Sequence, residues 1–259
     1  MYIIQNIIFL SLLQLLGVSV MAGSNCDSCK AKKGERSTIN EADYDIVSAR
    51  VKHNKTWGQL EFEITVKGIA GRSVSKAAGK MNGAPVDGYV FPTTLSSESI
   101  GFSKTEGIVA LALTAHPDFD DTPLWDEDGD GNYNNDKIIW HPHWVILVED
   151  KRVEGGLSVK EFDPKDKRVK LPKTNPGMPM YMDSPGFQVI TEGNAIRVVV
   201  PTYRVRFQSD FRYDAVGAYM QLSTGEKGQH SSNSKMPMLG VYKVYSALSK
   251  NLSLPYSVE

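Results

Sequence analysis

The chain has 259 residues, of which 41% are hydrophobic and 23% are charged. That length provides one large domain or two small ones with enough apolar material for a core. The formal net charge is −1, and no long run of lysine and arginine is present, which argues against the nucleic-acid-binding classes.

The first 22 residues have the pattern of a secretory signal. An apolar run over 7–20 leads to the small residue Ala22, where signal peptidase would cleave. A membrane anchor is the alternative, but the run is short for a spanning helix and is interrupted by Gln14 and Gly17. We therefore expect residues 1–22 to be a signal peptide, and the mature protein to be periplasmic, cell-surface or secreted, without a membrane span.

A polar stretch, 23–42, follows the expected cleavage site and contains the only two cysteines, Cys26 and Cys29. In an oxidising compartment this C-x-x-C pair can close a small disulfide. It can also bind a metal as thiolates, and both alternatives stay open. Because Lys30 rather than a histidine comes next, the pair is not a c-type haem site. We expect this stretch to be a flexible tail.

The rest of the chain has the pattern of many short strands. The segments are rich in Val, Ile, Tyr and Phe, are bounded by Gly, Pro, Asn or Asp, and show no long helical periodicity. Strands are expected over 44–51, 60–66, 108–115, 138–148, 157–162, 187–191, 195–200, 203–207, 215–222 and 239–245. This pattern predicts an all-β fold, an antiparallel β-sandwich or open barrel.

The expected domain is a single β-rich metal-binding unit over 43–250, followed by a C-terminal tail over 251–259. Three of its stretches are expected to be long irregular loops, at 71–95, 116–137 and 163–186. Loops of this length usually carry function or are disordered.

The middle loop contains a dense set of acidic and amide oxygens. Residues 126–137 follow the pattern D-x-D-x-D-G-x-x-x, which resembles the calcium loops of EF-hands and of dockerin-type repeats. Calcium takes six to eight oxygens, and alternate residues of a tight loop turned at Gly131 can supply them. The position of the usual bidentate glutamate is Lys137, with Asp136 one residue earlier. The alternative is that these Asp, Asn and Gly residues form a solvated turn that binds no calcium. The expected calcium ligands are Asp126, Asp128, Asp130, Asn132, Asn134 and Asp136.

Two histidines, His141 and His143, lie in the apolar segment 138–148. Alternate residues of a strand share a face, so both should project to the same side. The segment is apolar on both faces, and buried imidazoles need hydrogen bonds or a metal. His-x-His on a strand is a common half of a zinc or copper site, although histidines that only hydrogen-bond within a core are the alternative.

Further ligands for that site are expected just before the acidic loop. His116 ends the expected strand 108–115, and it is the natural third ligand if that strand lies beside the His-x-His strand. Asp118 or Asp120 is expected either as a fourth ligand or as a group that orients one of the rings.

Methionines form a second group of potential soft ligands. The sequence Met178-Pro-Met180-Tyr-Met182 places three thioethers on one side of an extended segment. Thioethers favour Cu(I), and the combination resembles exported copper-handling proteins in composition. The alternative is that these methionines fill gaps in the core.

Common catalytic motifs are absent: there is no G-x-S-x-G, H-E-x-x-H, P-loop or G-x-G-x-x-G. The sequence therefore favours an exported, non-catalytic protein that binds Ca²⁺ in the acidic loop and copper or zinc at the histidines, for metal capture or homeostasis. Two alternatives remain. One is a secreted metalloenzyme that uses the same histidines. The other is a calcium-stabilised module that binds carbohydrate or a surface.

Overall fold

The structure is a computed structural model that describes residues 39–76, 81–116, 140–224 and 234–259. All of them belong to the compact unit Glu35–Glu259. The expected signal peptide, both cysteines, Asp118, Asp120 and the expected calcium loop lie outside these residues, so the predictions made for them remain predictions. Within the described residues, no helix is long and apolar enough to cross a membrane.

The prediction of an all-β antiparallel fold is confirmed. One sheet has four antiparallel strands in the order β1-β2-β9-β8. Its members are β1 (Ile46–Asn54), β2 (Gln59–Val66), β8 (Val189–Glu192) and β9 (Ala195–Pro201). A separate short pair joins β10 (Arg212–Tyr213) to β13 (Tyr256–Ser257), so the expected C-terminal tail contributes a strand.

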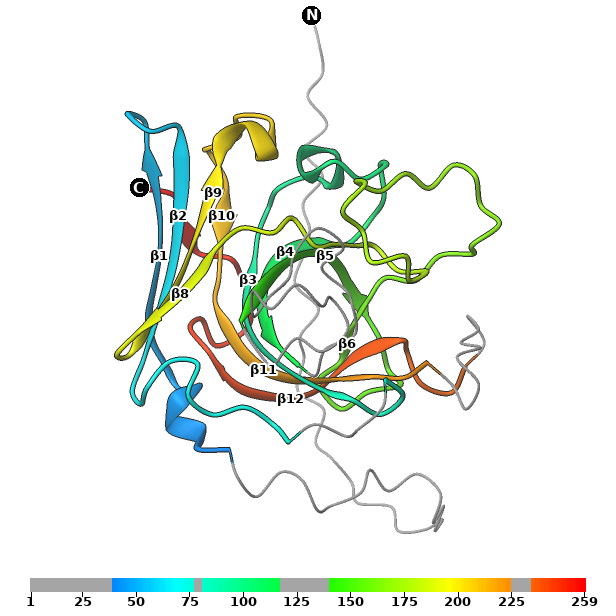
Figure 1. The fold of residues 1–259 in the computed structure, drawn as a ribbon, viewed down its shortest axis with the longest axis horizontal. Helices are drawn as coiled ribbons and strands as arrows, with labels where there is room; N and C mark the ends of the chain where they lie inside the picture. The colour runs from blue at the N-terminus through cyan, green and yellow to red at the C-terminus, as the bar shows by residue number, and fades with distance from the viewer. Residues whose placement is uncertain (1–38, 77–80, 117–139, 225–233) are drawn as a thin grey trace, which may run out of the picture. The chain divides into compact units, whose positions relative to one another are not determined.

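The second sheet closes on itself. Its order is β4-β3-β11-β12-β6-β5-β7, and β5 also pairs with β4, so that six strands form a barrel-like ring (Figure 1). The ring strands are β3 (Pro85–Pro92), β4 (Ile108–Ala115), β5 (His141–Glu149), β6 (Leu157–Val159), β11 (Val216–Leu222) and β12 (Leu239–Ala247). The short β7 (Met182–Asp183) pairs with β5 alongside the ring.

The four-stranded sheet packs against the outer face of the ring. Phe62 of β2 contacts two aromatic residues of the ring. Its ring centroid lies 5.2 Å from that of Phe91 on β3 and 6.4 Å from that of Trp144 on β5. Because strand residues alternate between faces, the neighbours of these aromatic residues point to the inside of the ring. The molecule therefore has one apolar core outside the ring and another inside it.

Two further expectations about local structure are wrong. The stretch 71–95, expected to be irregular, contains β3, whose Pro, Asp and Gly residues are rare in strands. Pairing with β11 on one side and β4 on the other outweighs those propensities. The expected strand 203–207 is instead a 3-10 turn, η4 (Thr202–Val205), followed by Arg206 in the left-handed conformation. Two further 3-10 turns, η2 (Glu41–Asp43) and η3 (Ser97–Ile100), precede β1 and β4.

Candidate metal centre

Two neighbouring strands of the ring bring three histidines together. β4 and β5 are antiparallel, with Thr114 opposite His141 and Ala112 opposite His143. Alternation turns both β5 histidines to the inside of the ring. His116 comes two residues after Thr114, and it therefore projects to the same side. The expectation that the strands carrying these histidines pair is confirmed.

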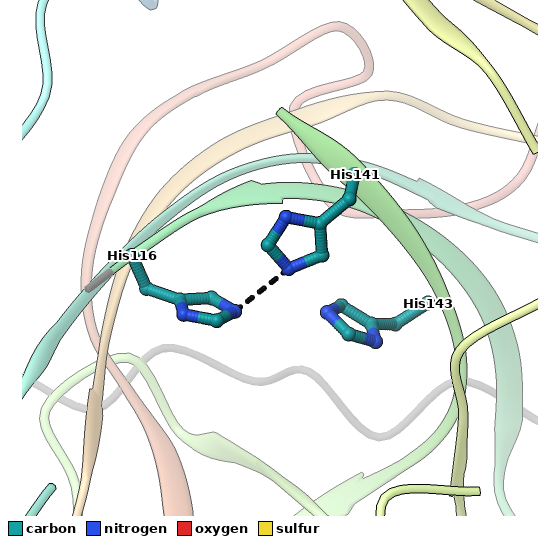
Figure 2. Close-up of side chains that lie close together, drawn as sticks. All are labelled: His116, His141 and His143. Carbon is teal, nitrogen blue, oxygen red and sulfur yellow. Dashed lines mark hydrogen bonds between the residues drawn. The ribbon is translucent and has the colours of Figure 1, made fainter. Parts of the chain in front are cut away.

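The three imidazoles converge at close range (Figure 2). Nε2 of His116 lies 2.8 Å from Nε2 of His141. The centroids of the His141 and His143 rings are 4.8 Å apart, and those of His116 and His143 are 6.0 Å apart. One ring nitrogen from each residue can be chosen so that all three lie within 4.8 Å of one another. This histidine cluster could hold a metal ion.

All three histidines of the cluster are buried, although their side chains are polar. His116, His141 and His143 expose 5%, 8% and 1% of their surfaces. Polar groups removed from water need partners, and the 2.8 Å contact between two Nε2 atoms supplies one when one of those nitrogens carries a proton. A cation that accepted the lone pairs of all three rings would satisfy the cluster more completely.

Ser184, which directly follows the short strand β7, orients one of the rings through a hydrogen bond. Nδ1 of His143 lies 3.0 Å from the hydroxyl of Ser184. The backbone N–H of Ser184 donates to the carbonyl of Thr174 at 3.0 Å, which holds that serine in place. When the ring donates through Nδ1, its lone pair is on Nε2, the tautomer that binds metal through Nε2.

The donor set fits a borderline transition metal. Neutral imidazole nitrogens bind zinc or copper at about 2.0–2.1 Å, and tetrahedral ligand nitrogens are then about 3.3 Å apart. The observed pair at 2.8 Å would need to separate by about half an ångström, which a small rotation of one side chain provides. Three protein ligands leave one tetrahedral position for water or another molecule.

The predicted methionines lie around the same cavity as the histidines. The ring encloses a cavity of about 70 Å³, and His116 and His143 line it together with Met178, Met180 and Met182. Met180 and Met182 are both buried. The predicted alternation is therefore confirmed, and both the copper-ligand and the gap-filling interpretations are compatible with these positions.

A buried carboxylate on a ring strand faces away from the cluster. Asp87 of β3 lies opposite Ala115, one residue before His116, but its neighbour Val86 is the residue that lines the cavity. Burial raises the pKa of Asp87 to about 6, although hydrogen bonds from the backbone N–H and hydroxyl of Ser75 lower it in part. Asp87 is therefore not a ligand in this arrangement.

Sequence reasoning missed two polar residues at the site, Ser184 and Thr114. Ser184 continues the alternation of Met180 and Met182, so the pattern M-x-M-x-S was a usable signal. Thr114 lines the cavity two residues before His116. Its position was predicted as strand, but nothing in the sequence pointed to a role.

Comparison with models of protein families, with curated proteins and with solved structures finds no match for this chain. The geometry of the site is therefore the basis on which a function can be inferred.

Proposed function

We propose that the protein binds one transition-metal ion, copper or zinc, through His116, His141 and His143. The observation that carries the proposal is the convergence of three buried imidazoles from two paired strands. Histidines that only hydrogen-bond within a core need a partner for each ring nitrogen, but those partners can be any polar groups and do not require three rings around one point. The role of Ser184 in orienting His143 adds the kind of outer support that metal-binding histidines usually have.

Copper is favoured over zinc by the surroundings of the cluster. Met180 and Met182 line the same cavity as His116 and His143. Thioethers are soft, uncharged ligands that select Cu(I), whereas zinc gains little from them. An apolar enclosure also suits the lower charge of Cu(I), because burying a charge in an apolar site costs more as the charge rises.

The biological role that follows is metal capture or homeostasis by an exported protein. Export is supported by the apolar N-terminal segment of the sequence, and Ca²⁺ binding by the oxygen-rich loop 126–136. A metalloenzyme is the second candidate, since three histidines leave one coordination position and the cavity reaches two of them.

The proposal is tested by equilibrium dialysis of metal-free protein against zinc, and against Cu(I) under reducing, anaerobic conditions. The unsubstituted protein should bind one equivalent, and the double variant His141→Ala/His143→Ala should bind none at the cluster. His53→Ala is the matched control, because His53 is a half-buried strand residue of β1. A double variant that remains folded and still binds one equivalent would show that the ion is held elsewhere.

The preference for copper has its own test. Met180→Leu/Met182→Leu keeps the apolar volume and removes the sulfurs. This variant should lose affinity for Cu(I) by about tenfold or more while its affinity for zinc stays the same. Equal affinities for Cu(I) in both proteins would assign the methionines to packing and leave the choice of metal to the histidines alone.

A further inference from the structure

The cavity inside the ring is lined almost entirely by apolar side chains. It has a volume of about 70 Å³, and every lining residue is apolar or glycine except Thr114, His116 and His143. These three polar residues lie together, because Thr114 and His143 occupy inward positions on the paired strands β4 and β5, and His116 follows β4 two residues after Thr114. The cavity therefore has a single polar end and is otherwise apolar.

Small residues at inward positions create this space. Ala112 on β4 and Ala218 on β11 line it, and Gly88 on β3 lies between Ala218 and Thr114 in the ladder. Larger residues of the same strands, such as Leu111 and Leu113, face outward into the other core. Protein interiors are normally packed to the density of organic crystals, so an unfilled apolar space of this size is uncommon.

The polar end offers the hydroxyl of Thr114, which can both donate and accept a hydrogen bond. Thr114 is 3% exposed, and its hydroxyl has no hydrogen-bond partner among the described residues. Such a buried hydroxyl is costly in the absence of a ligand, since it has lost its hydrogen bonds to water. A ligand that brought one polar atom to this point would restore the missing bond.

One side of the cavity reaches towards solvent. Val244 of β12 lines the cavity and is 40% exposed, and the half-buried Leu252 lies beside the same space. Both side chains are apolar, which suits the entry of an apolar molecule.

We propose that the ring binds a small neutral molecule with a short apolar chain and one polar end, such as a short-chain alcohol. The chain fills the apolar part of the cavity, and the polar atom hydrogen-bonds to the Thr114 hydroxyl beside the histidine cluster. This binding does not require the metal, although an ion held by the three histidines would lie close to the polar end of the ligand.

Methionine methyl NMR of the metal-free protein gives a direct test. Met180, Met182 and Met220 line the cavity, whereas Met81 is 39% exposed at the surface and serves as an internal control. Titration with 1-butanol should shift the three cavity methyls in a saturable way and leave Met81 unchanged. 1,3-Propanediol, with the same number of heavy atoms, should bind at least tenfold more weakly because its second hydroxyl would be buried without a partner.

Two variants separate this proposal from a general effect of solvent. Ala218→Leu adds three carbon atoms inside the ring and should abolish the shifts, whereas Ala195→Leu, the same change on the half-exposed start of β9, should preserve them. Thr114→Val should weaken binding of 1-butanol about tenfold and leave n-pentane binding unchanged, since only the alcohol uses the hydroxyl.

The outcomes are distinct from those of the metal experiment. Absence of saturable shifts in the unsubstituted protein, or equal shifts in folded Ala218→Leu, would overturn the ligand proposal even if zinc binds. Loss of metal binding in the histidine variants with butanol binding intact would support both proposals. Butanol binding by a protein that takes up no metal would retain the ligand site and overturn the metal site alone.

Discussion

The substitution Thr114→Val should stabilise the metal-free and ligand-free protein. The Thr114 hydroxyl is buried without a hydrogen-bond partner among the described residues. A buried hydroxyl in that state costs about 1–3 kcal/mol, and the methyl group that replaces it adds up to about 0.8 kcal/mol of apolar burial. After an allowance for imperfect fit of the new methyl group, the expected gain in the free energy of unfolding is about 1–2 kcal/mol.

The same substitution at Thr93 provides a matched control with the opposite sign. Thr93 is 2% exposed, and its hydroxyl donates to the carbonyl of Val109 at 2.9 Å and accepts from the N–H of Leu95 at 3.2 Å. Thr93→Val leaves both backbone groups without that partner. It should lower the free energy of unfolding by about 1–3 kcal/mol.

Urea denaturation of the unsubstituted protein and of both variants, in the presence of a chelator, measures these changes. The midpoint should rise for Thr114→Val and fall for Thr93→Val, with similar slopes in all three proteins. A loss of 1 kcal/mol or more in Thr114→Val would show that the hydroxyl has a partner in solution, and would refute the reasoning that leads from the cavity to its ligand. A gain would mean that Thr114 is kept at the expense of stability, as functional residues often are.

Three further predictions concern residues on the ring or beside it. Burial holds the pKa of Asp87 at about 6, above its ordinary value of 3.8, so protonation favours the folded state. The stability that this carboxyl contributes is complete below about pH 3.8 and is lost as the pH rises through 6. Asp87→Asn should therefore flatten the fall in unfolding free energy between pH 4 and 8 by up to about 3 kcal/mol, and an unchanged profile would contradict this. Gly217→Ala would place a Cβ 2.6 Å from the carbonyl oxygen of Tyr44, a backbone atom. It should cost about 1–3 kcal/mol in the same assay, and a neutral result would mean that the strand can shift. Ser184→Ala should lower metal affinity about tenfold or more with little change in stability, because it removes the hydrogen bond that orients His143. Equal affinity would leave that serine with a packing role only.

The strands with consistent local signals were predictable from the sequence. The run of apolar residues in β4 matches the expected strand 108–115 residue for residue. β3 was missed because Asp87 and Gly88 are poor strand formers, and their favourable interactions come from partners far along the chain. Closure of the ring depends on such long-range pairs as well, and no local pattern shows them.

The candidate site was predictable to a similar extent. Alternation along one strand placed His141 and His143 on one face. The hypothesis that the two expected strands are neighbours added His116 as a third ligand. The cavity and the partnerless hydroxyl of Thr114 could not be foreseen, because both result from how side chains of six strands pack around one space. The M-x-M-x-M pattern predicted a shared face but did not indicate which space it lines.

The metal content of the protein tests the central claim most directly. The chain should be purified from its native compartment without chelators or affinity-tag histidines, and analysed by mass spectrometry beside His143→Ala and His53→Ala. The account predicts close to one equivalent of copper or zinc in the unsubstituted protein and in His53→Ala, and a large loss in His143→Ala. A folded protein that carries no transition metal, or equal contents in all three proteins, would contradict a metal centre at His116, His141 and His143.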